Sequence, residues 1–128
     1  MKDVNIKPIK DEEAAHAIVT GWRSTLREIV RALAEGDYRV SRGIPTLAPV
    51  SSTTAEQIRT YVSSYGETLT ELPDDTWNTS VAQWMRAHWD VLVDLSTVES
   101  RPSDLVLHVR VFESPEGFRF EIDSVHVP

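Results

Sequence analysis

The fold is decided by WDVLVDLS at residues 89–96, DLVLHVRVFE at 104–113 and GFRFEIDSVHV at 117–127. Apolar residues occupy every second position in each stretch, and a period of two sends alternate side chains to opposite faces of a β-strand. The stretches therefore predict three successive antiparallel strands with one apolar and one polar face. The sequence SPEG at 114–117 predicts a tight hairpin between the last two, because proline presets φ and glycine accepts positive φ.

The segment before these strands, residues 79–88, fits two structures. Its apolar residues recur at helical spacing, but residues 81–85 can equally pair with 89–96 as a hairpin that turns around Arg86-Ala87. We favour the strand, because residues 89–96 are rich in β-branched side chains and need a neighbouring strand. The predicted sheet then covers residues 80–127 and has about four antiparallel strands.

Two helices are expected before the sheet. Residues 11–35 have an amphipathic pattern that opens with acidic side chains and stops at Gly36. Residues 54–65 form a second amphipathic stretch, with Thr53 as its N-cap, Glu56 completing a capping box, and Gly66 as its stop. Two helices packed on one face of the sheet give an α+β fold, and 128 residues suit a single domain over 1–128.

Composition excludes several functional classes. The chain has no cysteine, which rules out thiol nucleophiles, disulfides and cysteine-bound zinc. The charged segment 1–10 lacks the apolar centre of a signal peptide, and no apolar run reaches membrane-spanning length, so we expect a cytoplasmic protein with no membrane partner. Phosphate-binding loops, G-x-S-x-G, H-E-x-x-H and basic aromatic stripes are also missing. We therefore expect no cofactor and no direct nucleic acid binding.

The net charge of −7 is unevenly distributed. Residues 1–70 contain nine basic and nine acidic side chains, whereas 71–128 contain four basic and eleven acidic ones. A negative field repels nucleic acid and anionic membranes and attracts a basic protein. The simpler alternative is a surface that acidic residues keep soluble.

The polar face of the predicted sheet carries one concentration of charged residues: Asp90, Asp94, His108, Arg110, Arg119, Glu121 and Asp123. A carboxylate beside a histidine suits general acid-base catalysis, and Asp94, His108 and Asp123 are of metal-ligating type. Their spacing is specific for neither role, and cross-strand charge pairs on a solvated face explain the same residues more simply. We therefore predict no catalytic residue, no metal site and no enzyme activity.

Tryptophans accompany the acidic residues of the second half of the chain. Strand alternation assigns Trp89 to the core, and helical spacing assigns Trp22 to it as well. Trp77 lies in a turn-rich stretch and is the best candidate for an exposed aromatic anchor, followed by Trp84.

Residues 89–95, 103–107 and 118–128 together resemble a family of small uncharacterised bacterial proteins. Small acidic α+β proteins of this kind look like the immunity proteins encoded beside polymorphic or contact-dependent growth inhibition toxins. The resemblance implies that the protein neutralises a cognate toxin domain, in such systems often a nuclease, by binding it. No individual functional residue is carried over by this general likeness.

We accordingly expect an immunity-type inhibitor that occludes the active or substrate-binding site of a basic toxin. Its carboxylates would pair with lysine and arginine of the toxin, and a tryptophan would anchor the contact. The predicted partner-binding residues are Glu71, Asp74, Asp75, Trp77, Trp84, Asp90, Asp94, Glu99 and Asp104.

Two alternatives remain open. The order of a long helix, a second helix and a terminal meander also looks like the ketosteroid-isomerase-like cone fold. That likeness implies a small-molecule binder or enzyme with a pocket between the first helix and the sheet, lined by Trp22, Tyr38 and Tyr61. Alternation weakens it, because the sheet carboxylates fall on the opposite face. The other alternative is a homodimer in which the charged face pairs with itself.

Overall fold

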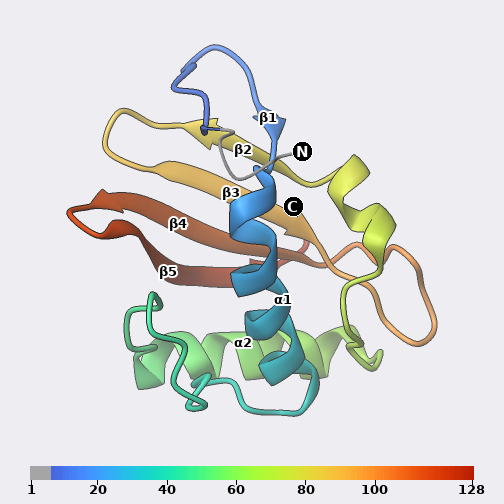
Figure 1. Cartoon of the computed structure of the whole chain (residues 1–128). Coiled ribbons are helices and arrows are strands. Elements are labelled where there is room, and N and C mark those ends of the chain that lie inside the picture. Colours follow the sequence, from blue (N-terminus) through green and yellow to red (C-terminus); the bar gives the residue numbers. More distant parts are fainter. Residues whose placement is uncertain (1–6) are drawn as a thin grey trace.

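Five antiparallel strands form one open sheet, and each strand pairs with the next one in the chain. They are β1 (His16–Ala17), β2 (Val81–Trp84), β3 (Trp89–Asp94), β4 (Val106–Ser114) and β5 (Gly117–His126) (Figure 1). This computed structural model describes residues 7–128, so residues 1–6 of the segment considered for a signal peptide lie outside it. The predicted α+β class is confirmed, with one strand more than the four expected.

The C-terminal meander follows the predicted alternation. Val91, Val93, Leu107 and Val109 point to one side of the sheet and are fully buried. The favoured strand at residues 81–84 is also confirmed: β2 pairs with β3, and Arg86 adopts a positive φ of 79° in the turn between them. The expected hairpin closes between β4 and β5, where Ser114 pairs with Gly117.

A β-bulge interrupts the alternation in β5. Val109 pairs with Ile122 and His108 pairs with Ser124, so Asp123 is the extra residue on the bulged strand. Strict alternation would turn Val125 outward, but the bulge shifts the pattern by one residue and buries this side chain completely. The bulge thus keeps β5 attached to the core at both ends.

Both helices are present, with starts that differ from the sequence-based expectation. α1 covers Thr20–Ala34 rather than 11–35, because His16 and Ala17 pair with β2 and the side chain of Asp11 closes a turn by accepting the amide of Glu13. α2 covers Ser52–Tyr65 rather than 54–65. The predicted cap at Thr53 is wrong: Ser51 is the N-cap, and its hydroxyl accepts the amide of Thr54 at 3.1 Å.

The helices and the sheet share one hydrophobic core. α1 crosses the apolar face of the sheet, and α2 lies beside β5 (Figure 1). The residues that α1 buries recur at helical spacing along its inner side: Trp22, Leu26, Ile29, Val30, Ala32 and Leu33. In the described part of the chain the opposite face of the sheet carries no helix, and this is the polar face.

Aromatic rings fill the space where α1 crosses the sheet. The ring of Trp22 lies 5.4 Å from that of Trp89, 5.3 Å from Phe118 and 6.3 Å from Phe120, in each case edge-on. Only 2% of Trp22 is exposed. The position at which the cone-type alternative expects a ligand beside Trp22 is therefore occupied by packed side chains.

Two glycines of the helices should respond to alanine in opposite directions. Gly66 caps α2 with φ 81°, so Gly66→Ala is expected to lower the free energy of unfolding by about 1 kcal/mol. Gly21 lies in the first turn of α1 with open space around its Cα, so Gly21→Ala should raise it by about 0.4–1 kcal/mol. Urea unfolding of the two variants measures both changes. Changes of the same sign in the free energy of unfolding would contradict the conformations assigned to the two glycines.

Candidate functional site

Residues 66–80 and 94–104 meet at one end of the sheet, and we call this surface the acidic end (right side of Figure 1). It contains four acidic residues in the first segment and three in the second, against one basic residue, Arg101. The segments are joined by backbone hydrogen bonds, such as the 2.8 Å bond from the amide of Val98 to the carbonyl of Thr68. Six of the seven predicted partner-binding acids gather here: Glu71, Asp74, Asp75, Asp94, Glu99 and Asp104.

The carboxylates of the acidic end differ in how far they are neutralised. Asp74 pairs with Arg27 of α1 at 2.7 Å, and Glu71 lies 3.6 Å from Arg31. The other five have no ion pair within residues 7–128, and Glu67 among them accepts the hydroxyl of Thr97 at 2.6 Å. Asp94 accepts the hydroxyl of Thr79 at 2.6 Å, and Glu99 accepts the amide of Thr68 at 3.1 Å. The side chains of Asp75 and Asp104 are exposed and make no hydrogen bond to the described residues.

The acidic end is hollowed and rigidly built. A shallow cavity of about 200 Å³ lies between the 3₁₀-helix η2 (Asp74–Asn78) and the loop after β3, and its lining includes Pro73, Asp75, Asn78, Ser96 and Pro102. The loop is held from beneath by buried Thr97, which donates to Glu67 at 2.6 Å, and by Ser103, which donates to the carbonyl of Leu95 at 2.8 Å. This surface is therefore preorganised.

The two tryptophans expected as anchors are not on this surface. The prediction that Trp77 is exposed is wrong: it is 7% exposed, because η2 turns its ring against α1, where Arg23 and Arg27 lie over it. Trp84 is half-buried, with its ring 4.5 Å from that of Trp89. The apolar residue that the acidic end does present is Val98, which is 62% exposed and gave no signal in the sequence.

Asp90 lies apart from the acidic end, on the polar face of the sheet. One oxygen of its carboxylate is 3.0 Å from Nε2 of His88 and 2.9 Å from Nε2 of His108. The second ring nitrogen of His108 lies 3.1 Å from Asp123, which also accepts from Arg110 at 2.7 Å. These five side chains, from β3, the turn before it, β4 and β5, form a histidine–carboxylate network.

His108 joins the two carboxylates of the network. Its Nε2 is hydrogen-bonded to Asp90 at 2.9 Å, and its Nδ1 lies 3.1 Å from an oxygen of Asp123. The bulge in β5 supplies this geometry by aiming Asp123 at His108 and Arg110.

The network includes part of the charged group expected on this face. Arg119 and Glu121 pair with each other at 2.9 Å instead, and Asp94 belongs to the acidic end. His88 was missed because the strand was expected to begin at Trp89; its spacing of two from Asp90 was the signal. Within residues 7–128 no group of three or more histidine, aspartate or glutamate side chains is arranged to hold a metal ion.

The network makes Asp90 a source of acid sensitivity. Burial raises the pKa of Asp90, but the hydrogen bonds and charges of His108 and His88 outweigh it and hold the pKa below its usual value of 3.8. Ionised Asp90 therefore stabilises the fold above about pH 4, and this stabilisation is lost as the pH falls through the lowered pKa of Asp90. Asp90→Asn should lower the free energy of unfolding at pH 7 by about 1–3 kcal/mol and flatten its dependence on pH below 4.

Asp11 provides the matched control for this prediction. Its pKa is also lowered, chiefly by the hydrogen bond from His16, but this pair lies at the surface, where solvent screens it. Urea unfolding between pH 2 and 7 should show a smaller effect for Asp11→Asn than for Asp90→Asn. Equal effects would mean that the network adds nothing to an ordinary surface pair.

The family model of a domain of unknown function, DUF7668, matches residues 30–128. The chain belongs to this family. The matched region of the DUF7668 protein begins within α1 and includes α2, the acidic end and the whole histidine–carboxylate network. Searches of curated proteins and of solved structures gave no significant match. Within residues 7–128 no helix is both long and apolar enough to cross a membrane.

Proposed function

We propose that this DUF7668 protein binds another protein, as an immunity-type inhibitor that places its acidic end over a basic substrate-binding or active site of a toxin domain. The observation that supports it is the gathering of Asp75, Asp94, Glu99 and Asp104 at one end of the sheet, with no cationic partner among residues 7–128. The acids are far apart in the sequence, and the fold concentrates their charge.

The physical chemistry of such a surface favours a basic partner. Uncompensated carboxylates around a cavity focus a negative potential that speeds the approach of a cationic surface and aligns it. Lysine and arginine that a nuclease uses for phosphate have the complementary charge. Val98 provides an apolar contact among the acids, and the hydrogen bonds of Thr97 and Ser103 limit the ordering that binding requires. The cone-type alternative lacks comparable support, because packed rings surround Trp22.

Charge reversal at the acidic end tests this proposal. The double variant Asp75→Lys/Asp104→Lys changes two exposed carboxylates that make no hydrogen bond, so the fold should be retained while affinity for a basic partner falls by at least about tenfold. Its control is Glu13→Lys/Glu116→Lys, which changes the total charge equally at two exposed sites outside the acidic end. Surface plasmon resonance against the partner measures both.

The partner itself is found by purifying the tagged protein from its native host with the neighbouring gene product co-expressed, followed by mass spectrometry. A stoichiometric basic protein that is lost with the acidic-end variant and kept with the control supports the proposal. Equal retention by both variants, or recovery of the protein alone or only as a homodimer, would argue against it.

A further inference from the structure

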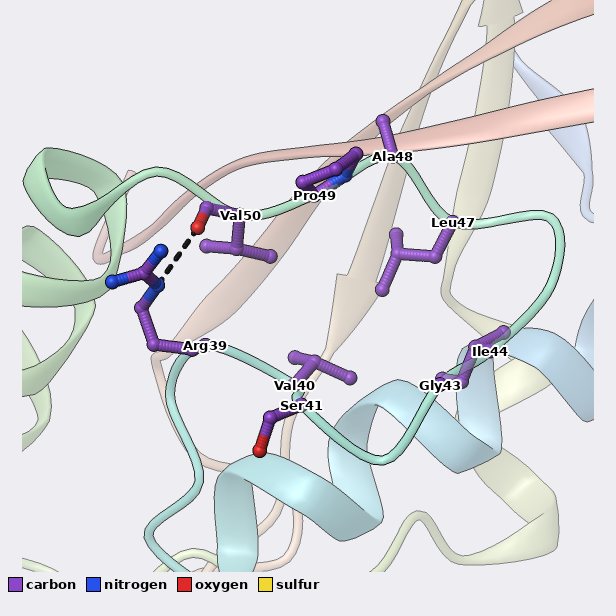
Figure 2. A pocket seen from close by; sticks show the side chains of 9 residues that line it. All are labelled: Arg39, Val40, Ser41, Gly43, Ile44, Leu47, Ala48, Pro49 and Val50. Carbon is purple, nitrogen blue, oxygen red and sulfur yellow. Dashed lines mark hydrogen bonds between the residues drawn. The ribbon is translucent and has the colours of Figure 1, made fainter.

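A second hollow lies in the loop between α1 and α2, apart from the acidic end. Residues of the segment 39–50 line an open hollow of about 450 Å³, and Figure 2 shows their side chains. Side chains of Val40, Leu47 and Val50 face its interior, and Arg39 stands at its mouth. Pockets that bind small organic ligands have volumes of about 300–1,000 Å³ and combine apolar walls with a few polar groups. This hollow has both features.

The backbone on either side of the hollow is anchored separately. On one side, Ala48 donates to the carbonyl of Phe120 at 2.8 Å and Phe120 donates to the carbonyl of Thr46 at 2.9 Å, which attaches this part of the loop to β5. On the other side, the carboxylate of Asp37 accepts the amide of Ser41 at 2.9 Å and closes a turn. Both sides of the loop are thus attached by hydrogen bonds, and its apolar residues Val40, Leu47 and Val50 belong to the core or pack against it.

Val40 shapes the wall of the hollow through an unusual backbone conformation. Its φ is 48°, in the left-handed region, which a β-branched residue seldom adopts. The side chain is only 6% exposed and faces the hollow, while Arg39 and Ser41 on either side of it are exposed. Strained positions of this kind persist where the surrounding structure enforces them, and they cluster at ligand sites.

Arg39 has a fixed position and an uncompensated charge. Its Nε donates to the carbonyl of Val50 at 2.9 Å, drawn as the dashed line in Figure 2. Within residues 7–128 no carboxylate forms an ion pair with it, and its two terminal nitrogens have no hydrogen-bond acceptor. A guanidinium held in this way presents donors in a planar fork that matches the two oxygens of a carboxylate.

We propose that this hollow binds a small organic acid, with its carboxylate on Arg39 and its apolar chain against Val40, Leu47 and Val50. A monoanion suits the site better than a phosphate, because a single arginine faces the mouth and the protein carries a net charge of −7. The site lies apart from the acidic end, so this proposal is tested independently of the proposed partner binding.

The test is a titration of the full-length ¹⁵N-labelled protein with octanoate, observed by two-dimensional NMR, beside titrations with 1-octanol and acetate. Octanoate is expected to shift the amides of residues 39–50 and to bind at least about tenfold more tightly than octanol, which offers the same apolar chain without the charge. Acetate, which lacks the chain, should bind too weakly to saturate.

Variants separate the role of Arg39 from general charge effects. Arg39→Gln should weaken octanoate binding about tenfold and leave the weak effect of octanol unchanged. Arg39→Lys keeps the charge without the fork and should give an intermediate loss. The control is Arg101→Gln, which removes another exposed arginine that has no acidic partner in residues 7–128. Because Arg39 is exposed, thermal unfolding should confirm that its variants stay folded.

Three results would overturn the proposal. Equal affinities for octanoate and octanol would show that the hollow binds only the apolar chain and that Arg39 does not recognise the carboxylate. Shifts outside residues 39–50 only would place binding elsewhere. Equal losses in Arg39→Gln and Arg101→Gln would show a dependence on total charge rather than on the guanidinium at the mouth of the hollow.

Discussion

Replacing Trp22 with alanine is expected to lower the free energy of unfolding by about 3–5 kcal/mol, the largest effect of a single substitution that we predict. Trp22 is one of the residues through which α1 packs on the sheet, and its ring meets Trp89, Phe118 and Phe120. Only 2% of the residue is exposed, so truncation leaves a cavity that rigid strands on one side cannot close. Domains of this size are stable by only about 5–15 kcal/mol, so the variant should be near the limit of folding.

Urea unfolding followed by circular dichroism measures this effect without depending on tryptophan fluorescence. Trp84→Ala is the control: Trp84 also packs on Trp89, at 4.5 Å, but it is half-buried, so its loss should cost about 1–2 kcal/mol. Similar losses in the free energy of unfolding for the two variants would show that the rings packed under α1 stabilise the fold no more than a half-buried ring does.

Replacing His108 with alanine should lower the free energy of unfolding by about 2–3 kcal/mol at pH 7, although the residue is polar and lies on an open sheet face. The side chain is 18% exposed and bridges Asp90 and Asp123. Its removal leaves two half-buried carboxylates that must rely on His88 and Arg110 alone. Most of the loss therefore comes from the charges left behind rather than from the missing ring.

The network assignment is checked by a double-mutant cycle with Asp90→Asn. In the His108→Ala background this substitution should cost less than in the wild type, with a coupling of about 1–2 kcal/mol. His126→Ala is the control, since in the described structure the side chain of His126 makes one hydrogen bond, to Ser124 at 3.1 Å, and its loss should cost less than about 1 kcal/mol. A coupling near zero would contradict direct contact between His108 and Asp90.

The candidate sites could be predicted only in part from the sequence. Alternation along residues 89–96 and 104–113 placed Asp90, His108 and Arg110 on one face, because a strand has a fixed period of two. It could not show which charges meet, since Asp90 is paired with Arg110 in the ladder yet bonds to His88 and His108. It also failed at Trp77, because a turn-rich stretch has no period from which burial can be read.

The sequence by itself determined the α+β class, the three C-terminal strands, their buried side and the end of α2 at Gly66. These features depend on local rules: side-chain period, turn chemistry and the freedom of glycine. Only the tertiary structure decided the rest. β1 has two residues, too few for a period, and exists because the edge of β2 offers it a partner.

The bulge at Asp123 likewise follows from the register of β5 against β4, and the acidic end from contacts between segments about thirty residues apart in the chain. Such features depend on which elements meet in space. A local pattern determines how one strand or helix faces the core, whereas a site is made by several elements whose separation in the chain leaves no local signal.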